Sequence, residues 1–492
     1  MILLDEALKN NPEKAFVLGK MHYILNNYDR ALADFDRALE MDPENAFALE
    51  YRGAVHFLLK NYDQALVDLN KALGINPESA FALQHRGAVH YMFNNYDQAL
   101  VDLDKTLEIE SENTFALTYR GVVYYIFNNY SKALVDLDRT LEIDPINAFA
   151  LEYRGVVHYM LNNYGQALID LDRALEIDPK SMFALKHRGV VHYTLKNYDL
   201  ALADLNRTLV IDPKSTFALK YRCAVYYTLK DDVKVLEDLD RILEIDPEDV
   251  ISLQINGVMN QKLHNYDQAL VDLGRILEIN PENVPMLVFR GNVYQILGNY
   301  DRAMIDLNKA LEIDPNNELA LGVRGIVYRN FGNYEQALAN FNKALEINSE
   351  SASSLEHRGR VYQMLGNYDA ALMDYNRSIE IEPECRSALG YRGDLHRLLG
   401  NFEQSLVDFN KCLKVDPDNA FALANRGEVY LRFGNYDQAR ADLDRALEID
   451  PENMVALENR GEVHEKLGNY DLAFADFDKA LKINHDEFTF EH

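Results

Sequence analysis

Histidine is the residue type in this sequence that most suggests a chemical function, because it recurs at a regular spacing. His158 and His192 lie 34 residues apart, and histidine fills the same position in several other segments. Neutral imidazole rings can bind metal ions or act as general bases. The same position holds Tyr124 and Tyr226 elsewhere, however. This exchange indicates an aromatic packing residue with a polar tip, not a conserved ligand set.

The remaining reactive side chains form no recognisable catalytic or metal-binding motif. His187 and His192 are five residues apart, which places them about 140° apart around a helix and prevents joint chelation. The cysteines Cys223, Cys385 and Cys412 show no metal-ligand spacing. Carboxylates are numerous, but no pair is confined to an apolar pocket. We therefore expect no catalytic residues, no metal site and no cofactor, and we predict that the protein is not an enzyme.

The elements that carry these residues form a repeat of fixed length. Residues 148–181 represent one copy, and Pro179 marks its end. Prolines recur at this point in most copies, whereas Ser111 and Ser349 take the place in two others. The prolines are Pro43, Pro77, Pro145, Pro179, Pro213, Pro247, Pro281, Pro315, Pro383, Pro417 and Pro451. A period of this length predicts a solenoid in which each unit stacks on the next.

Each copy contains two helical patterns. Apolar residues follow a helical period over 149–161 and again over 166–177, with polar residues at the other positions of the second segment. The residues 162–164 separate the two patterns, and Pro179 ends the second because proline donates no amide hydrogen bond. The sequence therefore predicts two antiparallel helices per copy, which bury their apolar surface only when copies stack.

The spacing of Gly155, Ala167, Ala174 and Pro179 resembles that of the tetratricopeptide repeat. Fourteen copies fit residues 12–487 without a gap, so the resemblance covers nearly the whole chain. It implies an all-α fold, a right-handed superhelical solenoid of antiparallel helix pairs whose first helices line a concave groove. It also implies a role in protein–protein interaction.

Arginine replaces the leucine that is usual in this family at one position of the first helix. Arg154 is an example, and Asp170 lies sixteen residues later on the second helix of the same copy. Because a buried arginine needs an anion, we expect an Arg154–Asp170 pair within the copy. The alternative is that the arginine extends its charged end into water along an apolar surface.

The remaining parts of the chain are assigned from departures from the repeat. Residues 1–11 are expected to form an N-terminal capping helix, and residues 488–492 a short tail. The copies over 216–283 form an irregular junction, where Cys223 replaces glycine, Val235 replaces alanine and Asn256 replaces arginine. Asp272 is thereby expected to lose its arginine partner. This junction is either a soft joint or a rigid stretch in which the superhelix widens.

The overall charge and composition restrict the partner and the compartment. The chain of 492 residues has a formal net charge of −29, which disfavours nucleic-acid backbones and anionic membrane surfaces. No apolar segment is long enough to span a bilayer, and the acidic first residues do not resemble a signal peptide. We expect a soluble, intracellular, cytoplasmic protein whose partner is a protein or peptide.

The outer face of the first helix is unexpectedly apolar in the early copies. A face that meets only water should be polar. In later copies its middle and last-turn positions become charged or polar, as at Arg329 and Arg360. The predicted partner-binding groove contains Phe115, Val122, Tyr125, Phe149, Val156, Tyr159, Phe183, Val190, Tyr193 and Tyr227. The alternative is that these rings are buried between neighbouring first helices.

These observations predict a protein-interaction scaffold. Its N-terminal half would hold an apolar or aromatic peptide or helix segment in the concave groove. The alternative function is a structural, self-assembling array that stacks weakly end to end through its uncapped C-terminal end. The residues expected to be structural are Arg154, Asp170, Gly155, Ala167, Ala174 and Pro179.

Overall fold

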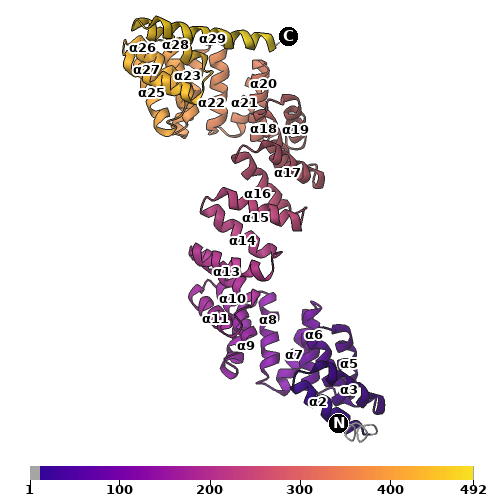
Figure 1. Ribbon diagram of the computed structural model, residues 1–492. Coiled ribbons are helices and arrows are strands. Elements are labelled where there is room, and N and C mark those ends of the chain that lie inside the picture. Colours follow the sequence, from indigo (N-terminus) through magenta and orange to yellow (C-terminus); the bar gives the residue numbers. More distant parts are fainter. Residues whose placement is uncertain (1–10, 491–492) are drawn as a thin grey trace. The chain divides into compact units, whose positions relative to one another are not determined.

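A computed structural model describes residues 11–490, with side chains to residue 483, so residues 1–10 of the expected capping helix lie outside it. The described chain is entirely helical apart from its turns and contains 28 helices in 14 antiparallel pairs (Figure 1). Each pair consists of a first helix of 13 residues followed by a second helix of at least 14 residues. The all-α helix-pair array predicted from the repeat is confirmed.

The chain divides into two compact units, the first ending at Pro247 and the second beginning at Glu248. The boundary lies inside the segment predicted to be an irregular junction. The helices of unit 1 are α2 (Pro12–Ile24), α3 (Tyr28–Met41), α4 (Ala46–Leu58), α5 (Tyr62–Ile75), α6 (Ala80–Met92), α7 (Tyr96–Ile109), α8 (Thr114–Ile126), α9 (Tyr130–Ile143), α10 (Ala148–Met160), α11 (Tyr164–Ile177), α12 (Met182–Thr194), α13 (Tyr198–Ile211), α14 (Thr216–Thr228) and α15 (Asp232–Ile245).

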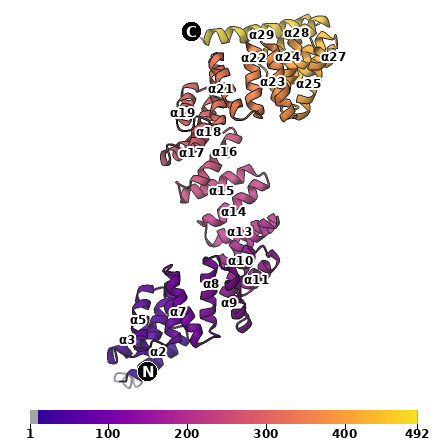
Figure 2. The same cartoon turned by 180° about the vertical axis from the view of Figure 1, so that it is seen from behind.

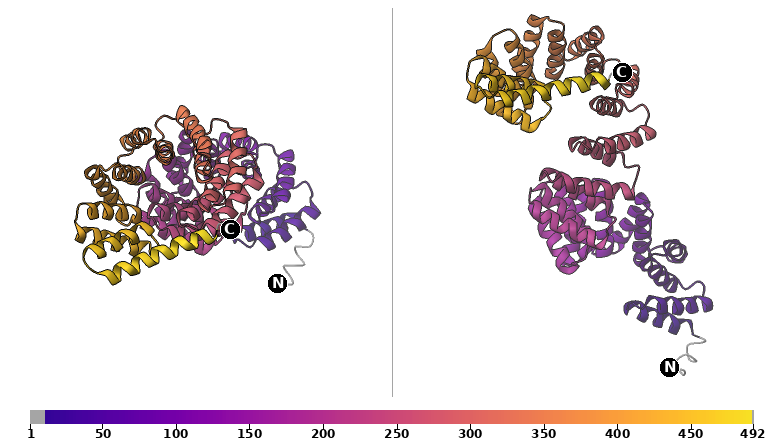
Figure 3. Two further views of the ribbon diagram at one scale, coloured as in Figure 1. Left: turned by 90° about the horizontal axis from the view of Figure 1, so that it is seen from above. Right: turned by 45° about the horizontal axis from the view of Figure 1, so that its top comes forward.

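Unit 2 has the same design, and Figure 2 shows its helices from behind. They are α16 (Val250–Lys262), α17 (Tyr266–Ile279), α18 (Val284–Ile296), α19 (Tyr300–Ile313), α20 (Glu318–Asn330), α21 (Tyr334–Ile347), α22 (Ala352–Met364), α23 (Tyr368–Ile381), α24 (Arg386–Leu398), α25 (Phe402–Val415), α26 (Ala420–Arg432), α27 (Tyr436–Ile449), α28 (Met454–Lys466) and α29 (Tyr470–Phe490). The last helix, yellow in Figure 3, has 21 residues and continues past residue 487, where we expected the final copy to end.

Local sequence signals set the helix ends. The Asn147 side chain accepts a hydrogen bond from the Ala150 amide at 3.0 Å and caps the N-terminus of α10. Between α10 and α11, Asn162 adopts a left-handed conformation with φ of 60°, and the Tyr164 hydroxyl donates to its side chain at 2.7 Å. Unit 2 has glycine with positive φ at this turn from Gly298 onward, which glycine adopts without strain.

Close contact between the two helices of a pair depends on small residues. A Cβ atom at Gly155 would lie 2.8 Å from Leu171 Cγ and 3.2 Å from the Ala167 carbonyl oxygen. Ala167 and Ala174 are fully buried, and α11 ends at Ile177, two residues before Pro179. These four predicted structural residues therefore occupy the positions that the repeat pattern gave them.

The expected Arg154–Asp170 pair is confirmed, and Arg154 also binds a second aspartate. Arg154 Nε and Nη2 donate to the two carboxylate oxygens of Asp170 at 2.8 and 2.7 Å. Its Nη1 donates to Asp138 Oδ1 of the preceding repeat at 2.7 Å. Burial alone would lower the pKa of Arg154, but the hydrogen bonds and charges of Asp170 and Asp138 raise it. The arginine thus links its own repeat to the one before it.

The arginine is missing from α16, and the structure there corrects our expectation for Asp272. Asn256 does replace the arginine, but Asp272 is not left without partners. Its carboxylate accepts hydrogen bonds from Asn260 Nδ2 and Gln268 Nε2, each at 3.3 Å. A local change of polar partners therefore compensates for the missing arginine.

Packing is looser in the helix pairs on either side of the boundary between the units. Cys223 Sγ lies 3.9 Å from the Val235 carbonyl oxygen, so two enlarged residues face each other between α14 and α15. Between α16 and α17, a Cβ at Gly257 would lie 3.7 Å from Leu273 Cγ, against 2.8 Å at the equivalent position of α10. Both pairs therefore lack the tight approach seen between α10 and α11.

We predict that amides of residues 216–283 exchange hydrogen faster than those of residues 114–181. Locally loose packing lowers the free energy of opening. Replacing Cys223→Gly together with Val235→Ala should slow exchange in α14 and α15, because it restores the small residues. The control Cys412→Ala changes a buried cysteine in α25 and should leave these helices unaffected. Equal protection of the two segments in the unmodified chain would contradict the prediction.

Candidate functional site

A continuous row of aromatic rings crosses the first helices of unit 1. Neighbouring rings have centroids 4.4–5.6 Å apart, within the range of favourable ring contacts. We call this set the aromatic ladder, and it comprises Tyr51, Phe81, His85, Phe115, Tyr119, Phe149, Tyr153, Phe183, His187, Phe217 and Tyr221. Each of α6, α8, α10, α12 and α14 contributes two rings, one turn apart.

Burial in the ladder disfavours the charged forms of Tyr153, His85 and His187. Burial raises the pKa of the Tyr153 hydroxyl, with a further increase from the Tyr91 hydroxyl that lies 3.3 Å away. Burial lowers the pKa of His85 to about 4, and burial together with the Lys186 charge lowers the pKa of His187 to about 3. Both histidines therefore serve as neutral aromatic rings, like the tyrosines at equivalent positions.

The predicted groove residues fall into three structural groups. Phe115, Phe149 and Phe183 belong to the ladder and are half-buried. Val122, Val156 and Val190 are buried and present almost no surface to a partner, so the structure does not support these three as groove contacts.

The predicted tyrosines form a second row beside the ladder. Tyr125 contacts Tyr153 with centroids 5.7 Å apart, and Tyr193 contacts Tyr221 at 6.2 Å. Tyr159 contacts Tyr164 of the following helix at 5.8 Å. These three rings are half-buried, whereas Tyr227 is exposed. Each of the three half-buried tyrosines therefore packs against a neighbouring ring and keeps part of its surface accessible.

The predicted site omitted the ladder rings that lie one turn after each phenylalanine. Tyr119, Tyr153, His187 and Tyr221 each follow a phenylalanine by four residues. Side chains four residues apart are neighbours on a helix, so this spacing was a usable signal. Histidine at two of the positions obscured it, because histidine suggested polar chemistry.

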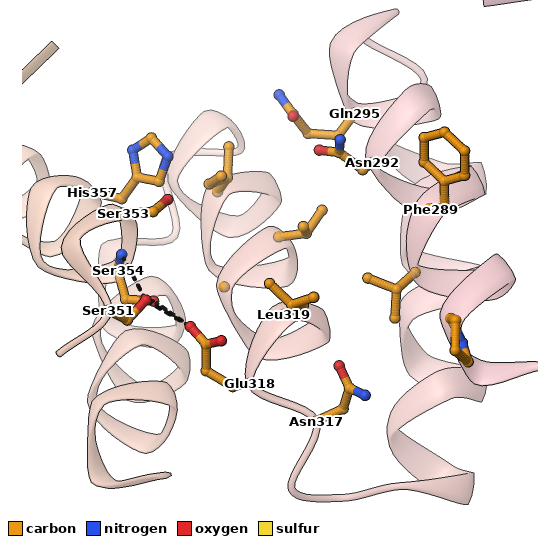
Figure 4. A pocket seen from close by; sticks show the side chains of 15 residues that line it. Phe289, Asn292, Gln295, Asn317, Glu318, Leu319, Ser351, Ser353, Ser354 and His357 are labelled. Carbon is orange, nitrogen blue, oxygen red and sulfur yellow. Dashed lines mark hydrogen bonds between the residues drawn. The ribbon is translucent and has the colours of Figure 1, made fainter. Parts of the chain in front are cut away.

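A pocket of about 640 Å³ lies in unit 2 between α18, α20 and α22 (Figure 4). Its apolar part includes Phe289, Leu319, Val323 and Ile326, and its polar part includes Glu318 and the serines of α22. Figure 4 shows the Glu318 carboxylate accepting a hydrogen bond from the Ser351 hydroxyl, at 2.6 Å. The pocket was not anticipated from the sequence.

The pocket exists because small residues replace the ladder rings. Val323 and Ser353 stand at positions equivalent to Tyr153 and Phe183 of unit 1. At Gly322, a Cβ would meet only Ser354 Oγ, at 3.7 Å. The volume that aromatic side chains fill in unit 1 is thus open in unit 2 and large enough for an apolar side chain.

Metal-ligating side chains do not cluster in the part of the chain that the structure describes. No three His, Cys, Asp or Glu side chains in residues 11–490 gather into a possible metal site. His158 lies beside the Arg154–Asp170 pair, with Nε2 3.9 Å from the carboxylate, and burial lowers its pKa. Within the same residues, no helix is both long and apolar enough to cross a membrane.

Comparisons with known proteins agree with the helix-pair geometry. Profiles described as tetratricopeptide repeat match residues 16–80, 148–181, 282–350, 316–384, 384–452 and 424–487. No curated protein gives a significant match.

Several solved structures are similar to this chain at low sequence identity. A tetratricopeptide repeat protein from Parabacteroides merdae is 24% identical, with a TM-score of 0.43, covering 51% of this chain and 98% of that chain. The Cut9–Hcn1 hetero-tetramer of the APC/C gives 15% identity and a TM-score of 0.44 over 94% of this chain and 98% of that chain. PilF of Pseudomonas aeruginosa is 20% identical, with a TM-score of 0.38, and the match covers 42% of this chain and 97% of that chain.

Proposed function

The chain belongs to the tetratricopeptide repeat family, whose members generally mediate protein–protein interactions, and we propose that it is a scaffold that binds an apolar or aromatic protein segment along unit 1. The aromatic ladder and its row of tyrosines carry this proposal. The family is typically non-enzymatic, in keeping with a role in binding.

Half-buried rings suit a binding surface because they are already held in place. Tyr125, Tyr159 and Tyr193 have few side-chain torsions, and ring contacts with Tyr153, Tyr164 and Tyr221 restrain them before a partner arrives. Binding then costs little conformational entropy, while the accessible part of each ring still offers apolar contact. Exposed Met92, Met160 and Tyr227 extend the apolar surface on the same first helices.

We predict that combining Tyr125→Ala, Tyr159→Ala and Tyr193→Ala abolishes partner binding while helix content by circular dichroism is kept. Tyrosine anchors are typically worth about 1 kcal/mol or more each when truncated. A photoreactive phenylalanine analogue at position 159 of the full chain should crosslink the partner. The same analogue at Val135, exposed on the second helix α9, is the matched control.

The crosslinked partner peptide should be apolar. An excess of the unmodified chain should reduce the crosslink yield, whereas an excess of the triple variant should not. Equal competition by the triple variant would show that the tyrosine row does not bind. Crosslinking from position 135 alone would place the interaction on the outer surface of the array and contradict the proposal.

A second candidate function, end-to-end self-assembly, is favoured by one surface of α29. Phe474 is 73% exposed and Leu481 68% exposed, whereas Leu447, equivalent to Leu481 in the preceding repeat, is buried. Phe477 does not belong to this surface, because it packs against Gly461 of its own pair. Sedimentation should show concentration-dependent association that Phe474→Glu with Leu481→Glu removes, and a strict monomer before mutation would exclude it.

A further inference from the structure

One arginine in unit 2 is buried without an anionic partner. Arg329, on the last turn of α20, is 8% exposed. Its Nη1 donates to His357 Nδ1 at 3.3 Å and its Nη2 donates to Asn330 Oδ1 at 3.2 Å, and both acceptors are neutral groups. In the described chain it forms no ion pair with a carboxylate. Arg154, by contrast, binds two.

A second arginine increases the positive charge at this place. Arg360, on α22, donates to the Tyr391 hydroxyl at 2.8 Å and lies over the Tyr391 ring, 4.7 Å from its centroid. Burial and the charge of Arg360 both lower the pKa of Arg329. The charges of Arg329 and Arg360 likewise act on His357, whose pKa burial lowers to about 3.

The Glu356 carboxylate influences Arg329 and Arg360 but does not neutralise them. Glu356 is buried on α22, and burial raises its pKa. The Ser387 hydroxyl and the Cys385 thiol donate to it, the latter at 3.6 Å. Its carboxylate is thus already hydrogen-bonded toward α24, and neither arginine forms an ion pair with it. The charge of Glu356 therefore offsets the cost of burying Arg329 only in part, because no carboxylate pairs directly with the guanidinium.

The arginines are continuous with the apolar pocket. His357 lines that pocket and also accepts the hydrogen bond from Arg329. Ile326, another lining residue, precedes Arg329 by one helical turn. We propose that this region of unit 2 is a second binding site, which takes an acidic–apolar peptide segment with its apolar side chain in the pocket and its carboxylate on Arg329 and Arg360.

The geometry limits the spacing within such a segment. The three residues from Ile326 to Arg329 rise about 4.5 Å along the helix axis, and an extended peptide advances about 3.3 Å per residue. The acidic residue of the peptide should therefore lie one, two or three positions before or after its apolar residue. The carboxylate of the peptide supplies the anion that Arg329 lacks, and it accepts a charge-assisted hydrogen bond from the guanidinium.

Fluorescence anisotropy of the full chain with short labelled peptides tests the proposal. The probes contain one phenylalanine and one glutamate that are either adjacent or separated by one or two glycines, each with a matched glutamine peptide. We expect at least one glutamate peptide to bind, and its glutamine counterpart to bind at least tenfold more weakly. Arg329→Met should weaken binding at least tenfold, and Gly322→Leu, which fills the pocket, should also weaken it.

Two controls separate binding from folding and from general charge. Arg377→Gln removes the same charge from exposed α23 and should leave binding unchanged. Arg329→Met should keep or raise the melting temperature, because it removes a buried charge that is only partly compensated, whereas a purely structural arginine would lower it. Binding of the glutamine peptides at equal strength, binding unaffected by Arg329→Met, or no binding by any probe at 1 mM would each overturn the proposal. Saturation by inorganic phosphate with no gain from a peptide would also overturn it.

Discussion

Asp170→Ala should destabilise α10 and α11 by about 3–5 kcal/mol, because it leaves the Arg154 guanidinium largely buried with Asp138 as its remaining carboxylate partner. Asp170 is completely buried and accepts two of the three hydrogen bonds that Arg154 donates to carboxylates. Since stability in such arrays is nearly local, the loss should appear in hydrogen exchange of these two helices more strongly than in distant ones.

The other carboxylate of the same arginine provides the control. Asp138 also accepts a hydrogen bond from Arg154, at 2.7 Å, but its side chain is 52% exposed. Exposed ion pairs are typically worth less than about 1 kcal/mol, so Asp138→Ala should have a small effect. Arg154→Leu combined with Asp170→Leu should recover much of the loss, because an apolar pair replaces the buried ions. Equal effects of the two aspartate variants would show that burial does not set the strength of the bridge.

Gly155→Ala should destabilise the same pair by about 1–3 kcal/mol through overpacking. The added methyl group would lie 2.8 Å from Leu171 Cγ and 3.2 Å from the Ala167 carbonyl oxygen, both too close for a carbon atom. Relief requires the helices to separate, which also disturbs the neighbouring buried leucines. Thermal unfolding combined with exchange at α10 and α11 measures the change.

The equivalent substitution in unit 2 should have the opposite sign. At Gly257 the added methyl group would contact Leu273 Cγ at 3.7 Å, an ordinary distance. Removing a glycine from a helix interior then stabilises the helix by about 0.5–1 kcal/mol. If Gly257→Ala destabilised α16 and α17 as much as Gly155→Ala destabilises its own pair, the looser packing next to the unit boundary would be disproved.

Features confined to one repeat could be predicted from the sequence. The helix ends depend on local residues such as Asn147 and Pro179, and the 34-residue period shows them many times. Arg154 and Asp170 could be paired because both lie on the packed faces of helices that must be antiparallel neighbours. Periodicity therefore determined the fold and the contacts within a pair.

Features that depend on how repeats stack were not predictable. Nothing in one repeat shows that Arg154 also reaches Asp138, or that Val156 is buried. Asp272 kept hydrogen-bond partners because Asn260 and Gln268 were close enough to replace arginine. The unit 2 pocket likewise results from small residues on different helices, whose side chains meet only after stacking.

The two aspartate partners of Arg154 and Arg188 have a consequence for how the copy number of this part of the array can change. Arg154 and Arg188 each bind one aspartate sixteen residues later and one sixteen residues earlier. If residues 148–181 were lost as a unit, Asp138 would come to occupy the place of Asp172 beside Arg188. Tyr119 would likewise come to meet Phe183 where it now meets Phe149. Unequal recombination in whole periods can therefore lengthen or shorten the array without leaving a charge unpaired at the new junction.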